Sequence, residues 1–490
     1  MSLLIPGTNS IKDTTYDVAN SLRFEGGSTD YLQRTLSAGN RRTFTISAWV
    51  KRSKLGAQQL IINTQDDGSN QAGLQFLSGD TLNFYSAISG TYYQLVTNRV
   101  FRDTASWLHI VAHYDTTNST SGDRIKLYIN GVRETSFSTE TQPSQDYDTF
   151  WNQNTKKLSI GTYGDGAGLN YSGYMTEVVM VDGQALDPTS FGEFDSDTPN
   201  VWKPKNISSL TFGTNGFHLD FEDSSSLGND AAGSNNFTVN NLTAIDQCTD
   251  TCTNNFATFT SENHTYSGFT VSEGNLKTHA SSGQKGLHGS SIMPTNSGKW
   301  YFEVKISDAA PGDGSRVGIM NYQTQLNNSS YSGTINTPQQ VLAGCTTSCK
   351  TGKHFVGVPG SVTEYTASGD YSDGDIVQFA MDLDNKAIYI GRNGTYLTQT
   401  GSSGGDPTSG SSKTGAITTS TTIMDGSPMT AYTGLSKPTG SADSEMLFNF
   451  GNPPFAISSG NTDGNGFGNF EYAPPTGYLA WCSKNLAESG

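Results

Sequence analysis

The chain has 490 residues, more than one compact core usually holds, so we expect two domains. Charged residues make up only 15% of the chain, and 55 glycines accompany abundant Ser, Thr and Asn, which favours an all-β protein. The formal net charge of −16, with no run of Lys or Arg to oppose it, argues against nucleic acid or an anionic membrane as a partner.

Residues 1–14 are expected to form an N-terminal arm, which begins "MSLLIPGTNS". No basic residue precedes its short apolar patch, so a secretion signal is not predicted, and no apolar stretch of the chain approaches the roughly 20 residues of a membrane helix. We therefore expect synthesis in a cytoplasm and no membrane insertion. The composition is nevertheless that of exported surface proteins, and release by lysis inside a virus particle would reconcile the two observations.

The first half of the chain shows the two-residue alternation of half-buried strands. In "TFTISAWVK" the residues Phe44, Ile46, Ala48 and Val50 alternate with polar neighbours. The segment "DRIKLYINGVRETSF" repeats the pattern, and its Asn130-Gly131 dipeptide is typical of a two-residue turn with positive φ. A β-hairpin is predicted there.

His109 and His113, in "WLHIVAHYD", have the spacing of two zinc ligands on a helix. Their neighbours favour a strand, on which residues four apart stand roughly 13 Å from each other and cannot share one ion. Ile110 also occupies the position where the helical zinc motif requires Glu. We therefore expect two polar strand residues and no metal.

Four segments, in this order, resemble the laminin-G-like, concanavalin-A-type jelly roll. They are "FTISAWVK", "WLHIVAHYD" with "IKLYINGVRE", "LSIGTY", and "YSGYMTEVVMVDGQALDP". The resemblance covers residues 15–205 and implies two antiparallel sheets packed face to face, a fold used for carbohydrate and protein adhesion as well as for glycan hydrolysis. The fold class expected for the chain is all-β, with two antiparallel β-sandwich domains in tandem.

Residues 206–254 are rich in turn-forming Ser, Asn and Asp and are expected to be an ordered linker. Carboxylates within it could hold calcium, although their spacing matches no known calcium loop, and a solvated loop is the alternative. The candidate ligands are Asp220, Glu222, Asp223 and Asp230. No cofactor is expected, with calcium as the possible exception.

Five cysteines form two C-x-x-x-C pairs, Cys248/Cys252 and Cys345/Cys349, with Cys482 alone. The sequence leaves three states open for the four paired residues: thiols, disulfides formed after release, and a zinc site of four thiolates. Cys482 is expected to be a buried thiol.

From residue 255 a second β-rich region begins, with "GKWYFEVKIS", "RVGIMN" and "DGDIVQFAMDLDNKAIYIGRNG". These stretches resemble a SPRY domain over residues 255–482, which implies a second sandwich, spanning 255–490, that binds through loops at one edge. The resemblance assigns Asp382 and Asp384 to a turn. Residues 323–371 and the low-complexity run 400–422 are predicted to be surface loops.

We expect no enzymatic activity. Glu193, Asp195 and Asp197, in "EFDSD", come nearest to the paired carboxylates of glycan hydrolases, but they follow the last predicted strand of the first domain. No G-x-S-x-G, G-x-x-x-x-G-K-[ST] or H-E-x-x-H motif occurs in the chain.

Three further stretches, "LIPGTNSIKDT", "FGNPPF" and "YAPPTGYLAWCSKNL", resemble stretches in virion proteins of tailed phages of aquatic bacteria, and this likeness covers nearly the whole chain. This resemblance implies a virion surface protein, a tail-fibre or appendage adhesin that contacts host-surface glycan or protein. Its expected partners are other virion proteins and further copies of itself, for example in a trimer. A purely structural capsid-decorating protein, a polysaccharide depolymerase and a bacterial lectin are the alternatives.

Tyrosines expected on loops are the candidate ligand-binding residues, because aromatic rings stack on sugars. Each could instead pack on its own domain. They are Tyr92, Tyr93, Tyr331 and Tyr365.

Overall fold

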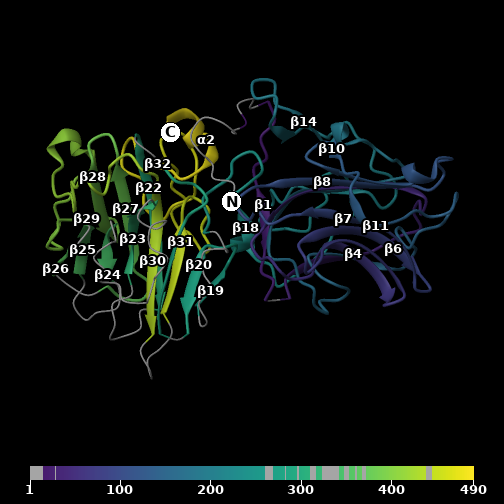
Figure 1. Ribbon diagram of the computed structural model, residues 1–490, viewed down its shortest axis with the longest axis horizontal. Coiled ribbons are helices and arrows are strands. Elements are labelled where there is room, and N and C mark those ends of the chain that lie inside the picture. Colours follow the sequence, from purple (N-terminus) through teal and green to yellow (C-terminus); the bar gives the residue numbers. More distant parts are fainter. Residues whose placement is uncertain are drawn as a thin grey trace. The chain divides into compact units, whose positions relative to one another are not determined.

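The computed structural model describes residues 11, 15–27, 29–259, 269–281, 283–294, 297–308, 316–322, 342–346, 353–358, 361–366, 371–437 and 444–489. Strands dominate these residues, and the short helix α2 (Ser483–Ser489) lies at the C-terminal end (Figure 1). The all-β prediction is confirmed. The chain divides into two compact units, one spanning Ile11–Asn255 and one containing Phe256–Gly490. The expected N-terminal arm lies outside the described residues, apart from Ile11.

The first unit is built from two antiparallel sheets of eight strands each. The β13 sheet has the order β10 (Val132–Arg133), β9 (Ile125–Ile129), β8 (Leu108–Asp115), β3 (Thr43–Arg52), β13 (Gly173–Asp182), β1 (Ser21–Phe24), β18 (Gln247–Cys248), with β16 (Phe217–Leu219) also paired to β13. The β6 sheet has the order β11 (Phe137–Thr141), β7 (Thr91–Val100), β6 (Thr81–Ile88), β5 (Asn70–Phe76), β4 (Gln59–Asp67), β12 (Lys157–Ile160), β2 (Tyr31–Thr35), β17 (Thr238–Asn240).

The core of the first unit lies between these two sheets. Phe44, Ile46, Ala48 and Val50, the alternating residues of β3, are all fully buried in it. Phe84 of β6 meets Tyr114 of β8 with ring centroids 5.0 Å apart, so side chains of the two sheets interdigitate. The alternation in the sequence therefore predicted the inward face correctly.

The outer face of the β13 sheet is also covered. A second apolar cluster there joins Val111, Val179 and Val181 of the sheet to Phe191 and Ile207 of the segment that follows it. The small hairpin of β14 (Gly192–Phe194) and β15 (Trp202–Pro204) belongs to this segment. All ten residues of β13 are consequently buried, as in a strand covered on both faces.

Residues 206–254 do not form the linker that the sequence predicts. They contribute β16, β17 and β18 to the two sheets of the first unit. These strands are two or three residues long, too short to produce a recognisable alternation, and turn-forming residues surround them. The composition of the segment thus predicted its turns but not its place in the sandwich.

The predicted hairpin joins β9 to β10. Asn130 and Gly131 have φ of 47° and 79°, the left-handed values that a two-residue turn of this type needs. The Asn130 side chain also accepts a hydrogen bond from the backbone N–H of His109, at 2.8 Å.

The second unit contains an eight-stranded and a six-stranded sheet. The larger has the order β19 (Phe269–Ser272), β20 (Lys277–Ala280), β31 (Ser444–Asn449), β22 (Lys299–Asp308), β27 (Ile376–Asp382), β28 (Ala387–Arg392), β29 (Thr395–Leu397), with β32 (Leu479–Ala480) also paired to β22. The smaller has the order β21 (Gly283–His288), β30 (Met429–Lys437), β23 (Arg316–Asn321), β24 (Leu342–Thr346), β25 (Lys353–Val358), β26 (Ser361–Thr366).

Residues of both sheets share one buried core, which includes Phe302 and Phe379 of the larger sheet and Ile319 and Ala431 of the smaller. The region 323–371, predicted to be a loop, instead supplies β24, β25 and β26, so that prediction is wrong for its described part. Glycines and polar residues interrupt the alternation of these strands in the sequence. In the sheet, β24 pairs with β23, β25 with β24, and β26 with β25.

The second unit confirms the predicted turn at the end of β27. Asp382 accepts hydrogen bonds from the backbone and side-chain nitrogens of Asn385, each at 2.8 Å, and Asp384 accepts one from the Gly298 N–H at 2.9 Å. The low-complexity run 400–422 includes a 3-10 turn at Pro407–Ser412, and its Ile417 is fully buried and hydrogen-bonded to the backbone of Ile388.

Candidate functional site

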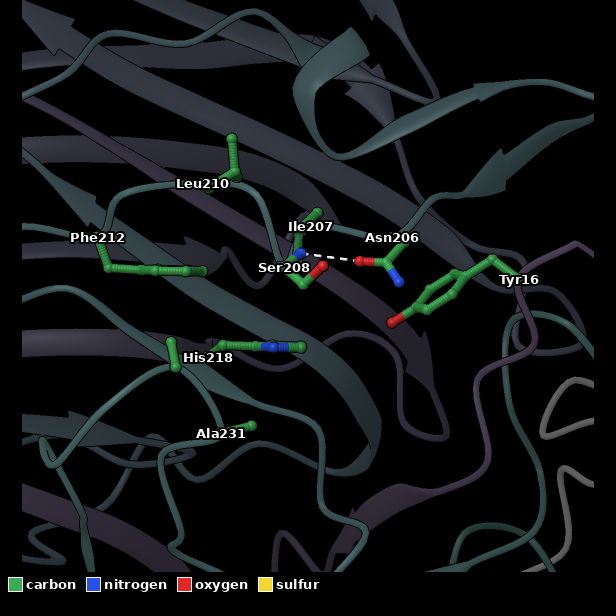
Figure 2. A pocket seen from close by; sticks show the side chains of 9 residues that line it. Tyr16, Asn206, Ile207, Ser208, Leu210, Phe212, His218 and Ala231 are labelled. Carbon is green, nitrogen blue, oxygen red and sulfur yellow. Dashed lines mark hydrogen bonds between the residues drawn. The ribbon is translucent and has the colours of Figure 1, made fainter.

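A hollow of about 300 Å³ opens on the first unit, beside the outer face of the β13 sheet (Figure 2). We call it the Tyr16 hollow. It is lined by Tyr16, by residues 206–212 between β15 and β16, by His218 of β16, and by the turn at Ala231 and Ala232. Most of its wall therefore comes from the segment that the sequence predicted to be a linker.

Two residues of the lining, Tyr16 and His218, are held by Glu177 of β13, which does not itself line the hollow. The pairing of β13 with β3 shifts register between Thr176 and Val179, and Glu177 there has a left-handed φ of 48°. Such a bulge turns the side chain to a direction that a regular strand would not give it. The buried Glu177 carboxylate accepts a hydrogen bond from the Tyr16 hydroxyl at 3.1 Å and lies 3.1 Å from Nε2 of His218.

Charge around the hollow is predominantly negative. Burial alone would lower the pKa of His218, but the hydrogen bond and the charge of Glu177 raise it above the ordinary value. Burial and the neighbouring carboxylates of Asp220 and Glu177 raise the pKa of Glu222. Burial and Glu177 likewise raise the pKa of the Tyr16 hydroxyl. The groups around the hollow thus hold their protons tightly, and the surrounding carboxylates would repel an anionic ligand.

Flat ring surfaces flank the hollow. The rings of Phe212 and His218 are parallel, with an interplanar angle of 1° and centroids 6.5 Å apart. Figure 2 shows them on one side, with the Tyr16 hydroxyl pointing toward the space from the other. Exposed Asn206 and Ser208 add an amide and a hydroxyl at the rim, and the Asn206 side-chain oxygen accepts the Ser208 N–H at 2.8 Å. Rings beside hydrogen-bonding groups are the chemistry that a sugar requires.

The tyrosines predicted as ligand-binding residues are not in this hollow. Tyr92 and Tyr93 lie on strand β7 and not on a loop. The Tyr92 hydroxyl accepts a hydrogen bond from Gln71 at 2.8 Å, and the Tyr93 ring packs edge-on against Tyr147 with centroids 4.7 Å apart. Tyr365 lies on strand β26, again not on a loop. Tyr331 is outside the described residues.

The four candidate calcium ligands do not form a metal site. Among the residues that the structure describes, no group of three or more His, Cys, Asp or Glu side chains could hold a metal. Buried Asp230 instead orders its loop, because its carboxylate accepts the N–H groups of His218, Ala232 and Asn235. Asp223 and Asp220 accept N–H groups within their own turns, from Ser225 and Glu222.

The C-x-x-x-C pair Cys248/Cys252 is not a disulfide, since both residues are thiols. Burial, with the nearby Glu177 carboxylate as the next cause, raises the pKa of Cys252 well above its usual value, so this thiol stays protonated. Cys482 is a buried thiol, as predicted. Cys345 lies on β24, and Cys349 is outside the described residues, so the three alternatives for this pair stay open.

His109 and His113 lie on strand β8, as predicted, and each has a structural partner. Nδ1 of His109 accepts the indole N–H of Trp202 at 2.9 Å, and its Nε2 lies 2.9 Å from Ser47 Oγ. Nδ1 of His113 lies 3.1 Å from the carbonyl oxygen of Leu186. These rings fasten the outer segment to the β13 sheet.

The carboxylates of "EFDSD" do not converge either. Glu193, on β14, forms an ion pair with Lys203 at 3.3 Å. Buried Asp195 accepts the N–H groups of Asp197 and Thr198, at 2.9 and 2.8 Å, and so closes a turn.

Sequence reasoning missed Glu177, His218, Tyr16 and Phe212. One signal was available: Glu177 is the only charged residue within the apolar run "YMTEVVMV", where a carboxylate must find partners. The partners themselves are 41 and 161 residues away along the chain, so only the fold identifies them.

Comparison with known proteins shows a family match for the first unit. Residues 26–189 match the model of the concanavalin A-like lectin/glucanases superfamily described as Laminin_G_3. No protein with curated annotation matches the sequence. No helix among the described residues is long and apolar enough to cross a membrane.

Solved structures resemble parts of the chain at low similarity. A candidate carbohydrate binding protein from Bacteroides ovatus is 18% identical over 46% of this chain and 60% of its own, with a TM-score of 0.33. The SPRY domain of human HERC1 is 14% identical over 37% and 92%, with a TM-score of 0.25. Tailspike protein 2 of an Escherichia coli O157:H7 bacteriophage is 17% identical over 47% and 31%, with a TM-score of 0.30. Values this low establish no shared function.

Proposed function

We propose that this chain is a non-catalytic adhesin on the surface of a phage virion and that it binds a neutral host-surface glycan in the Tyr16 hollow. The observation that carries the proposal is the parallel pair of Phe212 and His218 beside the amide and hydroxyl of Asn206 and Ser208, on a buried carboxylate that fixes His218. The lectin/glucanase family match of residues 26–189 supports a saccharide as the ligand.

The virion location rests on the resemblance of the chain, over nearly its whole length, to phage virion proteins. In this proposal the partners are other virion proteins and further copies of the chain, with a trimer as one arrangement. A shallow hollow gives weak binding to one sugar, and several copies on one particle multiply it through effective concentration.

A non-catalytic role agrees with the carboxylates that the structure describes. Glycan hydrolysis needs two carboxyl groups that face the same bond, about 5 to 9 Å apart. The Glu177 carboxylate contacts Tyr16 and His218, and the Glu193 carboxylate forms an ion pair with Lys203. The experiment below distinguishes this role from that of a depolymerase.

The test measures binding of the purified chain to a panel of neutral oligosaccharides and to host cells. Phe212→Ala removes a stacking surface and is expected to weaken binding about tenfold, which corresponds to roughly 1.4 kcal/mol. Phe194→Ala is the matched control, because Phe194 is an exposed aromatic residue of the same unit, 49% accessible, outside the hollow. The Phe194→Ala variant should bind the same glycan with the affinity of the unmodified chain.

Three results would contradict the proposal. Failure to bind any glycan or host cell indicates a purely structural virion component. Release of reducing sugar that Glu193→Gln abolishes indicates a depolymerase. Absence of the protein from purified particles, examined by immunogold labelling, removes the virion role.

A further inference from the structure

A second hollow, of about 230 Å³, lies in the first unit at one end of the β13 sheet. We call it the Trp107 hollow. Val50 and Arg52 at the end of β3, the connection from β7 to β8, and Asn130 of the β9–β10 turn form its wall. The connection crosses from one sheet to the other, so the hollow lies at the rim of the sandwich and not on its outer face.

Arginines dominate the charged groups of this wall. Arg52, Arg99 and Arg102 line it, against Asp103 alone in the lining and Asp80 as the partner of two of them. Three cations against two carboxylates leave an excess positive charge, in a chain with a formal net charge of −16. A local reversal of sign in an acidic protein is a candidate anion-recognition site.

The three arginines have different roles. Arg52 is 3% exposed, stacks on Phe76 at 4.3 Å and forms an ion pair with Asp80 at 3.1 Å, so it belongs to the framework. Arg102 contacts Asp80 only through Nε, at 3.0 Å, and its side chain is 59% exposed. The Arg102 side chain is therefore accessible to an anion from solvent.

Arg99 carries a charge that no carboxylate of the described residues neutralises within ion-pair distance. Its guanidinium lies over the ring of Phe101 at 5.3 Å, which holds it in place without consuming its hydrogen-bond donors. Planar guanidinium groups match carboxylate and sulfate oxygens in pairs, and Arg99 and Arg102 line the same hollow.

Apolar surface lies beside these cations. Val100 is 44% exposed, and Trp107 also lines the hollow. The Trp107 ring is fixed, because its indole N–H donates to Asp250 at 3.0 Å. A sugar ring can pack on this surface while its acidic substituent reaches the arginines.

We propose that the Trp107 hollow binds an acidic saccharide, with Arg99 and Arg102 pairing the carboxylate or sulfate group and Trp107 and Val100 packing on the sugar ring. This site is separate from the Tyr16 hollow and takes ligands of the opposite charge preference. The inference therefore does not rest on the proposed function.

The experiment titrates the full chain with three saccharide probes by calorimetry. A uronic acid oligomer carries carboxylates, a sulfated disaccharide carries sulfates, and a neutral oligomer of matched length carries neither. Binding of either acidic probe is expected, together with at least about tenfold weaker binding of the neutral one. The two acidic arms distinguish a carboxylate from a sulfate as the preferred group.

Variants locate the binding. Arg99→Gln and Arg102→Gln are each expected to weaken the acidic probe about tenfold or more, whereas Phe212→Ala should leave it unchanged. Arg133→Gln is the matched control, since Arg133 is an equally charged residue of the same unit, 43% exposed and outside the hollow. Thermal unfolding midpoints confirm that each variant is folded.

Four outcomes overturn the inference. In the first, neither acidic probe binds. In the second, neither Arg99→Gln nor Arg102→Gln weakens binding of the acidic probe, and in the third, Arg133→Gln weakens it as much as these two variants do. In the fourth, inorganic phosphate competes for the site as well as the acidic saccharide does. Because the Tyr16 hollow is tested with neutral glycans and Phe212→Ala, failure of one proposal leaves the other standing.

Discussion

Glu177 adopts a backbone conformation that a residue with a side chain seldom accepts. A left-handed φ of 48° inside a strand costs on the order of 1 kcal/mol or more, and it persists only where the surroundings compensate. Here the compensation comes from Tyr16 and His218, which both contact one carboxylate. Strained residues cluster at functional sites, and Glu177 holds two residues that line the Tyr16 hollow, which is why we favour this hollow.

His109 shows how a buried ring makes stability depend on pH. It is fully buried, and desolvation lowers its pKa to about 3. Nδ1 already accepts the Trp202 N–H, so a proton there would face another donor. Because the unfolded chain binds this proton near pH 6.5 and the folded chain does not, the associated stability is complete above pH 6.5 and is lost progressively as the pH falls toward 3.

We predict that His109→Gln makes the free energy of unfolding depend less on pH below pH 6.5. In the unmodified chain this residue should contribute a slope of about 1.4 kcal/mol per pH unit between pH 6 and 4, measured from urea unfolding midpoints. The variant should lose that part of the slope, although it is less stable at pH 7. His279→Gln, on β20 of the second unit, is the control. Equal slopes for the unmodified chain and His109→Gln would refute the argument.

At the scale of elements, the β9–β10 hairpin couples a turn to the outer segment. Gly131 has φ of 79°, and a Cβ atom there would come within 2.4 Å of the Trp202 ring. Two costs thus act at one position: backbone strain of about 1 kcal/mol and displacement of an indole that also holds His109.

Gly131→Ala should therefore lower the free energy of unfolding by roughly 2 to 4 kcal/mol. Gly90, in the turn between β6 and β7, supplies the matched control, since its φ is 76° and nothing lies within 4 Å of the corresponding Cβ position. Gly90→Ala should cost only the strain, about 1 kcal/mol. Chemical denaturation of both variants decides the matter; similar losses for the two would show that Trp202 does not restrict the turn.

At the scale of the whole molecule, the first unit needs residues 206–255 to complete its sandwich. Six large apolar residues of this segment are buried in the core between the two sheets. They are Phe217, Leu219, Phe221, Leu227, Phe237 and Leu242. At about 1.5 to 3 kcal/mol each, their burial is comparable to the whole stability of an ordinary domain.

We predict that a fragment of residues 11–255 folds alone and that a fragment of residues 11–205 does not. The longer fragment should show one cooperative thermal transition and well dispersed amide resonances. The shorter fragment should show neither, because β13 loses β16 and the core loses those side chains. A cooperative transition at a similar temperature for residues 11–205 would mean that the segment only decorates a finished fold.

The sequence by itself determined the class of the molecule and its regular parts. Two-residue alternation predicted β3 and the β9–β10 hairpin, because side chains of a strand alternate between faces whatever the strand pairs with. The segments that flank β8 predicted a strand there. The low charge content indicated an all-β chain, and the Asn-Gly dipeptides predicted turns whose φ values follow from local sterics alone.

Only the tertiary structure decided which residues of the candidate site meet. Glu177, His218 and Tyr16 come together through a bulge in β13 and a three-residue strand, and neither feature has a sequence period. The excess charge of the Trp107 hollow likewise depends on which arginines Asp80 pairs with. Local patterns record how each segment faces the core, whereas a site is built from contacts between distant segments, whose geometry appears only after the sheets have packed.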